Sequence, residues 1–325
     1  LIFSNFKNEY KLTHLVFNPD KATNLFKDTK KIITKVFFIY TFLTALFFIL
    51  FVFSGIRLFN SFNLAMTISS TGAFLPTNEL SEIIRHFSQK IILTFALIFS
   101  TLNIYFFYSI LSNKNIFKKH HEDILILFAV FFFSILLFFS IQETSFLNIF
   151  LSVVSSLSNS GLTTFKPPEN FHLFFIFLTI IGGSIISNSS GIKFLRLYIL
   201  FKSTVFEIFK LVSPNIIIDQ RILKTEHKIN NENLSSSFLI FICFFISIFI
   251  LSSVLTAGGL NFESSFKLSI LTITNTVNSS LFGLNNIDFF NLLTSSKIFL
   301  ILFMVIGKIE LLSFFLIIKK IFSRN

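Results

Sequence analysis

The chain has 325 residues, of which 53% are hydrophobic and only 13% are charged, and its mean hydropathy is +0.78. Soluble domains carry roughly 25% charged residues, so this composition excludes a soluble enzyme. The formal net charge is +11, and the single cysteine, Cys243, excludes an internal disulfide or a cluster of thiolate ligands.

Six apolar stretches are long enough to cross a bilayer, which takes about 20 residues of α-helix. They cover residues 36–56, 91–113, 124–142, 170–192, 233–262 and 298–318, the last of which contains Lys308 and Glu310. The sequence therefore predicts an all-α integral membrane protein with six spans.

Three further uncharged stretches, 58–78, 144–165 and 268–287, are rich in Ser, Thr and Asn. Irregular polar backbone survives at membrane depth only inside protein or beside water. Each stretch begins with a helix-compatible half and ends in a cluster of small residues. We expect three re-entrant pore loops, each with a half-helix entering the membrane and an extended strand leaving it.

The charges agree with this topology when both termini are placed in the cytoplasm. Of the 27 basic residues, 20 then lie in cytoplasmic segments, as the positive-inside rule requires. The net charge thus follows from insertion into a lipid bilayer at the cytoplasmic (inner) membrane, and we expect no nucleic-acid partner.

The order span, polar loop, span occurs three times, which predicts parallel repeats related by an axis along the membrane normal. We divide the chain into a cytoplasmic lead-in (1–33), a second unit (34–121), a third unit with a broken second span (122–201), a cytoplasmic linker (202–233) and a fourth unit (234–325). This numbering expresses the expectation that a first unit is missing.

The small-residue clusters at 69–74 and 157–162 have the chemistry of a cation filter. Backbone carbonyls can replace the hydration shell of an ion, and glycine at Gly72 or Gly161 lets the loop adopt positive φ. A half-helix whose C-terminus points at the ion adds about half a negative charge. The alternative for either cluster is a simple Ser/Gly turn between helices.

These residues resemble the potassium-transporting superfamily of TrkH, TrkG and KtrB, whose members look like four fused M1–P–M2 units of a potassium channel. Residues 67–74 are similar to the second filter of the family, usually STGGF, and 158–162 resemble the third; 274–279 align best with TNTGPG. The resemblance implies these filter residues: Ser70, Thr71, Gly72, Ala73, Asn159, Ser160, Gly161, Asn275, Thr276, Val277 and Asn278. It places Ala73 at the second glycine of STGGF and Val277 where a glycine belongs, although valine rarely accepts positive φ. Either the fourth filter is relaxed, its alignment is shifted toward Gly283, or the protein is less selective than its relatives. The spacing of the repeats, by contrast, centres the clusters on Gly72, Gly161 and Val277, which aligns Gly72 with Gly161.

The most specific match is residues 181–193, which resemble the IGGCxGSTAGGIK motif of the family, an intramembrane loop that gates the pore. Residues 307–310 resemble GRLE of the last span, whose basic residue projects into the pore. The implied gate residues are Gly182, Gly183, Ser187, Asn188, Ser189, Ser190, Gly191, Lys193, Lys308 and Glu310. The alternatives are a small-residue helix interface at 181–193 and an ion pair of Lys308 with Glu310 near the membrane surface.

The resemblance implies the pore-forming subunit of a potassium uptake system, a homodimer with a cytoplasmic nucleotide-binding regulatory subunit of the TrkA or KtrA type. K⁺ would be the transported ion, bound only at the filter, with no cofactor on this chain. Rival hypotheses are a poorly selective or sodium-permissive cation pathway on the same fold, and a membrane-embedded transferase or assembly factor. His120 and His121 lie in a charged segment that we expect to be a solvated turn.

Overall fold

The computed structural model describes residues 25–72, 74–77, 80–111, 120–141, 144–213, 222–223, 229, 231–276, 280–284, 287, 289 and 292–309. The helices of this part are α2 (Leu25–Phe53), α3 (Leu58–Ser70), α4 (Phe87–Thr101), α5 (Ile104–Leu111), α7 (His121–Ser140), α8 (Phe146–Leu157), α9 (His172–Ile181), α10 (Phe194–Val212), α11 (Asn231–Ala257), α12 (Phe262–Ile273) and α13 (Thr294–Ile309). Short 3₁₀ turns, η2 (Leu80–Glu82), η3 (Glu169–Phe171) and η4 (Ser280–Phe282), lie between them. The described residues contain no strand.

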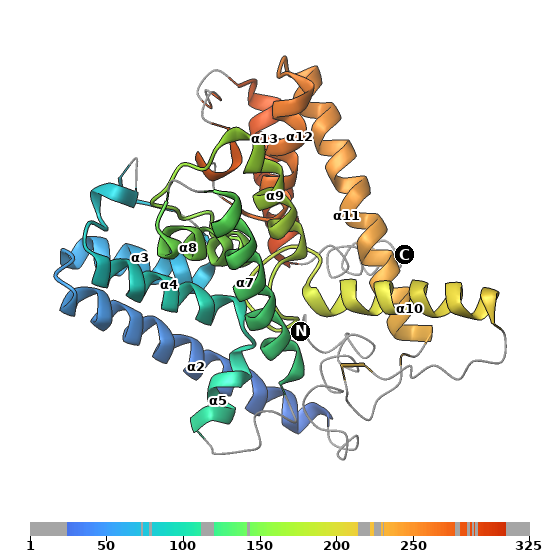
Figure 1. Ribbon diagram of the computed structural model, residues 1–325, viewed down its shortest axis with the longest axis horizontal. Helices are drawn as coiled ribbons and strands as arrows, with labels where there is room; N and C mark the ends of the chain where they lie inside the picture. Colours follow the sequence, from blue (N-terminus) through green and yellow to red (C-terminus); the bar gives the residue numbers. More distant parts are fainter. Residues whose placement is uncertain are drawn as a thin grey trace.

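A long helix, a short helix and another helix follow one another three times: α2–α3–α4, α7–α8–α9 and α11–α12–α13. Each short helix packs against the helices that precede and follow it. In Figure 1 these groups lie side by side, with α7–α9 between α2–α4 and α11–α13. Contacts of α4 with α8 and of α9 with α12 join each group to the next.

The long helices carry apolar side chains on their outer faces. Phe38 of α2 is 72% exposed, Phe128 of α7 is 69% exposed and Phe249 of α11 is 61% exposed. Such large exposed apolar surfaces mark contact with a membrane or a partner. Three described helical segments, Val36–Phe53, His121–Ser140 and Asn233–Ala257, are long and apolar enough to cross a bilayer by length and composition.

Two of the predicted spans are not continuous helices. The second half of the third unit was expected to be broken, and α9 does end at Ile181, with α10 beginning at Phe194. The stretch 91–113 was expected to be unbroken, which is wrong: α4 ends at Thr101 and α5 begins at Ile104. The break occurs because Asn103 acts as a cap, its Oδ1 accepting the Tyr105 amide at 2.9 Å.

Two predicted boundaries also move. The segment 202–233 was expected to be a linker, but α10 continues to Val212 and projects from α7 toward and beyond the lower end of α11 (Figure 1). The span expected to reach residue 262 ends at Ala257, and the short helix α12 begins at Phe262 rather than at 268. The turn between them, at Gly258 and Gly259, interrupts what reads in the sequence as one apolar run.

Gly307 allows α13 to approach the end of α12 closely. A Cβ atom at this position would lie 2.0 Å from the carbonyl oxygen of Ile273, so no larger residue fits without a shift of backbone. We predict that Gly307→Ala destabilises the folded protein by about 1–3 kcal/mol through overpacking, measured as a lower thermal midpoint in detergent. Val305→Ala, at a 52% exposed position of the same helix, is the control and should change little. Equal midpoints for the two variants would contradict the close approach.

Candidate ion pathway

The three short helices α3, α8 and α12 end in the same way. Within two residues of the end of each helix lies a non-glycine residue in the left-handed conformation: Thr71 (φ 50°), Asn159 (φ 60°) and Asn275 (φ 55°). The amide of each of these residues bonds the carbonyl three positions earlier, at 3.1 or 3.2 Å, and the next amide bonds the carbonyl five positions earlier, at 2.8–3.1 Å. This pairing is a C-capping turn of the Schellman type, and it fixes a common register for the three loops.

The common register differs from the one expected from the sequence. Because Thr71 corresponds to Asn159, Gly72 corresponds to Ser160 and not to Gly161. Gly161, at φ 65°, instead corresponds by position along the chain to Ala73 and Val277. The alignment of Gly72 with Gly161 was therefore wrong by one residue, because the left-handed residue that ends each helix is Thr or Asn.

Ala73, Val277, Asn278 and Glu310 lie outside the described residues. By its place in the sequence, the third loop alone has glycine at the Gly161 position, since the second has alanine and the fourth valine.

Side chains of the left-handed residues fasten each loop to a neighbouring segment. Asn159 Nδ2 donates to the carbonyl of Thr179 in α9 at 2.7 Å, and Asn275 Nδ2 donates to that of Met304 in α13 at 2.9 Å. The side chain of Thr71 has no amide group, and instead its hydroxyl donates at 2.9 Å to the carbonyl of Asn188 in the loop between α9 and α10. The same position in each loop thus makes a side-chain bond to a backbone carbonyl.

The loop 182–193, here called the gate loop, is compact and internally bonded. Its two ends lie together, with the Ile192 amide bonding the Ile180 carbonyl at 3.0 Å and the Phe194 amide bonding that of Gly183 at 3.1 Å. Lys193, only 3% exposed, points its ammonium group into the loop, where it donates to the carbonyls of Ser187 and Ser189.

The other predicted gate residues between 182 and 193 lie within the same loop, whereas Lys308 lies on α13. Gly182 ends α9 at φ 69°, Gly191 has φ 84°, and Ser189 Oγ accepts the Gly183 amide at 2.9 Å. The Ser190 side chain is buried, and its hydroxyl makes no hydrogen bond to a described residue. An irregular segment of this kind can lie at membrane depth because its backbone groups are paired within protein.

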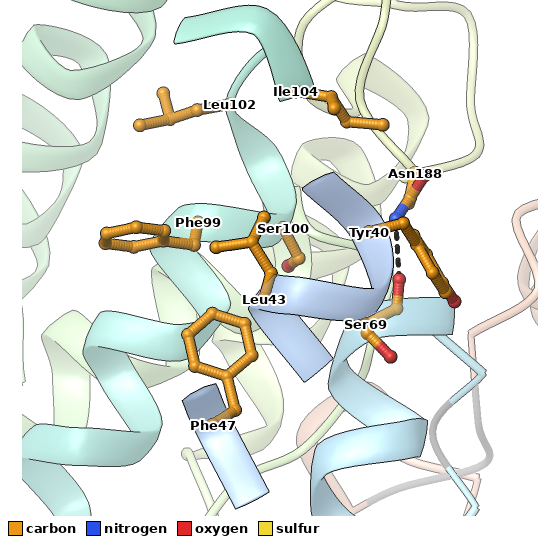
Figure 2. A pocket seen from close by; sticks show the side chains of 9 residues that line it. All are labelled: Tyr40, Leu43, Phe47, Ser69, Phe99, Ser100, Leu102, Ile104 and Asn188. Carbon is orange, nitrogen blue, oxygen red and sulfur yellow. Dashed lines mark hydrogen bonds between the residues drawn. The ribbon is translucent and has the colours of Figure 1, made fainter. Parts of the chain in front are cut away.

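The gate loop contacts the end of α3 directly. Asn188 Nδ2 donates to the carbonyl of Ser69 at 2.6 Å, as Figure 2 shows. Lys308 of α13 reaches the same place, and its ammonium group donates to the Ser70 carbonyl at 2.6 Å, to Thr71 Oγ1 at 2.8 Å and to the Asn188 carbonyl at 3.0 Å. Three oxygens from the second loop and the gate loop therefore surround one monovalent cationic group.

A small cavity lies beside this contact, between α2, α4 and the gate loop (Figure 2). It encloses about 20 Å³, room for about one water molecule, and it is lined by Tyr40, Leu43, Phe47, Ser69, Phe99, Ser100, Leu102, Ile104 and Asn188. The Asn188–Ser69 hydrogen bond is at the edge of the cavity, so the gate loop is not packed solidly against α2 and α4.

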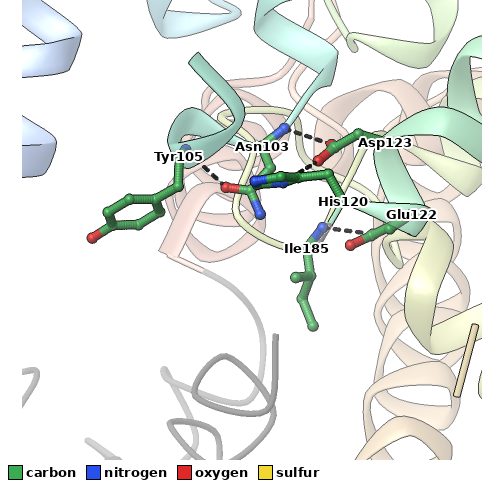
Figure 3. A network of polar contacts seen from close by, with 6 residues as sticks. All are labelled: Asn103, Tyr105, His120, Glu122, Asp123 and Ile185. Carbon is green, nitrogen blue, oxygen red and sulfur yellow. Dashed lines mark hydrogen bonds and ion pairs between the residues drawn. The ribbon is translucent and has the colours of Figure 1, made fainter. Parts of the chain in front are cut away.

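Sequence reasoning missed a second polar cluster, at the start of α7 (Figure 3). The expected solvated turn at His120 is wrong, because the side chains of His120, Glu122 and Asp123 are 3%, 4% and 1% exposed. Asp123 accepts the Asn103 amide at 2.8 Å and pairs with His120 Nδ1 at 3.1 Å, while Glu122 accepts the Ile185 amide at 2.9 Å. Two acidic residues at the head of a long apolar run were the signal that could have revealed it.

His172, at the first turn of α9, also has a role that sequence reasoning did not anticipate. Its Nδ1 lies 2.9 Å from the Leu281 carbonyl, in the turn that follows the fourth loop, and its ring packs on Gly283. No group of three or more His, Cys, Asp or Glu side chains within the described ranges is placed to hold a metal ion.

Comparison with known proteins identifies the fold. The potassium transporter TrkH from Vibrio parahaemolyticus has a similar structure, with a TM-score of 0.79 and 18% sequence identity over 95% of this chain and 68% of that one. The architecture is therefore that of a multi-pass, all-helical membrane protein with the TrkH fold.

Two curated proteins are similar in sequence, and no family model matches the chain. The Trk system potassium uptake protein TrkG of Escherichia coli is 24% identical over 95% of this chain and 65% of its own length. An uncharacterized cation transporter of Methanocaldococcus jannaschii is 24% identical over 73% of this chain and 49% of its own length. The chain thus spans about half to two thirds of the curated relatives, and it is a distant relative of the TrkH and TrkG potassium transporters, which are not enzymes.

The Asn159 side chain offers a test of how the third loop is held. Asn159→Asp keeps the size and the tolerance for positive φ but replaces the donor to the Thr179 carbonyl with an acceptor at a fully buried position. We expect a loss of about 1–3 kcal/mol, seen as a lower thermal midpoint in detergent. Asn63→Asp is the matched control, since Asn63 bonds the Phe59 carbonyl within α3 at a partly exposed site. A control variant as unstable as Asn159→Asp would contradict the assignment.

Proposed function

We propose that the chain forms the pore of a potassium uptake system of the Trk or Ktr type. The observation that carries this proposal is the shared left-handed turn at the ends of α3, α8 and α12, next to which lie the gate loop and Lys308. The proposal includes six membrane spans and three re-entrant loops, divided into units at 34–121, 122–201 and 234–325. K⁺ would be bound by backbone carbonyl and hydroxyl oxygens at the loops.

The electrostatics of the short helices support a cation pathway. Each helix C-terminus carries about half a negative charge, and the three C-termini lie near the gate loop or α13. The α3 end bonds Asn188, the Asn159 side chain lies near Gly182, and the last carbonyl of α12 lies against Gly307. Lys308 already places a positive charge at the first of these ends, where a passing ion would compete with its ammonium group for the Ser70 carbonyl and Thr71.

The hydroxyl groups beside the left-handed residues are paired with each other, which favours carbonyl oxygens as the principal ligands. Ser158 Oγ lies 2.8 Å from Ser160 Oγ, and Thr274 Oγ1 lies 2.7 Å from Thr276 Oγ1. A filter of fixed carbonyls holds an ion without the mobile charges that would trap it.

The Trk system named for the relatives supports a cytoplasmic regulatory partner of the TrkA or KtrA type. The helix α10 offers a docking surface, since it projects from the bundle and carries Lys202 and Lys210 with exposed apolar residues such as Leu211 (Figure 1). We further propose a homodimer in the cytoplasmic membrane with both ends of this chain in the cytoplasm.

A second candidate is a poorly selective or sodium-permissive cation pathway on the same fold. It is favoured by Ala73 and Val277, which occupy the chain positions that correspond to Gly161. A side chain at these positions hinders the positive φ that Gly161 adopts, so two of the three loops would present fewer inward carbonyls.

Selectivity distinguishes the two candidates and tests the register. We predict that Gly161→Ser in the full-length protein lowers the K⁺ over Na⁺ preference about tenfold, because serine resists φ 65°. Gly72→Ser is the matched control: φ at Gly72 is not positive, and the third loop carries serine at the equivalent position, so its preference should be unchanged. The measurement is ⁸⁶Rb⁺ and ²²Na⁺ uptake into proteoliposomes. A wild-type protein that admits both ions equally would establish the second candidate instead, and a drop with Gly72→Ser alone would restore the alignment expected from the sequence.

Removal of the Lys308 ammonium group should open the pathway. We predict that Lys308→Met raises basal ⁸⁶Rb⁺ flux about tenfold, because three hydrogen bonds that join α13 to the second loop and the gate loop are lost. Lys210→Met, at an exposed position on α10, is the control. Unchanged or reduced flux in a well-folded Lys308→Met protein would show that this lysine is structural and does not obstruct the ion.

A further inference from the structure

The adjacent residues Glu122 and Asp123, here called the acid pair, connect the break between α4 and α5 with the loop between α9 and α10. Asp123 Oδ1 accepts the amide of Asn103, at the break between α4 and α5, at 2.8 Å. Glu122 Oε1 accepts the amide of Ile185, in the gate loop, at 2.9 Å (Figure 3). One turn of α7 therefore holds backbone from two segments that are far apart in the sequence.

The two breaks also pair directly with each other. The amide of Ser184 donates to the carbonyl of Thr101, the last residue of α4, at 2.9 Å, and the amide of Ile104 lies 3.4 Å from the carbonyl of Ile186. Each break leaves backbone groups without a helical partner, and each supplies some of the partners that the other lacks. The acid pair completes this arrangement by accepting two of the remaining amides.

Both carboxyl groups of the acid pair are buried, and few side chains contact them. His120 pairs with Asp123 and packs edge-on against Phe106 of α5, with ring centroids 5.3 Å apart. Glu122 Oε2 has no hydrogen bond to a described residue, and the Glu122 carboxyl group is buried beside that of Asp123, with the ammonium group of Lys193 as its cationic neighbour. A buried carboxyl group with few, directional partners is costly to keep in the folded state.

We propose that the acid pair is a clasp that holds the gate loop closed by fastening it to the first turn of α7. The inference rests on the proposed function, because it assigns to the pair the control of the proposed ion pathway. Glu122 and Asp123 bond backbone amides and are positioning residues, which would act on the pathway through the gate loop.

The test measures access to the gate loop by thiol modification. The background is a full-length protein in which Cys243→Ser removes the native thiol of this chain. Ile186→Cys then introduces a single reactive thiol into the gate loop, at a side chain that makes no hydrogen bond. Inside-out vesicles are treated with a charged, impermeant methanethiosulfonate reagent. We expect Glu122→Ala to raise the modification rate about tenfold, the equivalent of about 1.4 kcal/mol. Glu122→Gln should raise it less, because its amide oxygen still accepts the Ile185 amide.

Glu207→Ala is the matched control, an exposed carboxylate on α10 whose loss should leave the rate unchanged. If Glu122→Ala does not fold, Glu122→Gln decides, since it keeps the size of the side chain and should still raise the rate above that of the control. A rate equal to that of the control in folded Glu122 variants, or a rise of the same size in Glu207→Ala, would overturn the clasp. Basal ⁸⁶Rb⁺ flux should rise with the modification rate, whereas simple damage to the fold would lower flux.

The two readouts separate the clasp from the function. Thiol access does not depend on which ion is carried, so a wild-type protein that transports no K⁺ would reject the proposed function while leaving the clasp intact. A wild-type protein that transports K⁺, with Glu122 variants that leave access unchanged, would reject the clasp alone.

Discussion

The structure depends on how backbone groups at the ends of interrupted helices find partners inside a membrane. Lipid supplies no hydrogen bonds, and each unpaired group costs several kcal/mol. In this molecule the interrupted segments satisfy one another: the Ser184 amide meets the Thr101 carbonyl, and Asn159 meets the carbonyl of Thr179. Where a carbonyl is left at a helix end, as at Ser70, a cationic group binds it. The cation pathway proposed for this chain and its stable broken helices would therefore both follow from the same requirement.

Much of this arrangement could be predicted from the sequence, because small polar residues at membrane depth have few structural uses. Two of the three polar stretches contain the short helices α3 and α8, the third contains only the second half of α12, and the glycine-rich segment after Ile181 is the gate loop. The register of the filters could not be predicted. The residue that takes positive φ is Thr71, Asn159 or Asn275, and threonine in that conformation is uncommon enough that glycine was the natural choice.

The break between α4 and α5 and the burial of the acid pair were missed for a related reason. The stretch around Leu102 is uncharged and mostly apolar, so hydropathy predicts a continuous span. The backbone groups that pair with those at the break belong to the gate loop, about 80 positions further along the chain. In the same way, Glu122 and Asp123 next to His120 read as a solvated turn, because charged residues are rarely buried unless paired. Long-range pairing decided both outcomes, and the local sequence does not identify the partner in either case.

The three loops share the same backbone turn, but different contacts hold them in place. A movement of one neighbouring segment would therefore not affect the three loops equally. The third and fourth loops are each fastened to the helix that follows them, through Asn159 and Asn275. The second loop has threonine at this position and is fastened to the gate loop through Asn188 instead. A movement of the gate loop would therefore disturb the second loop first, while the other two keep their supports. The same threonine also accepts Lys308, so the one loop without an asparagine is the place where α13, the gate loop and the end of α3 meet.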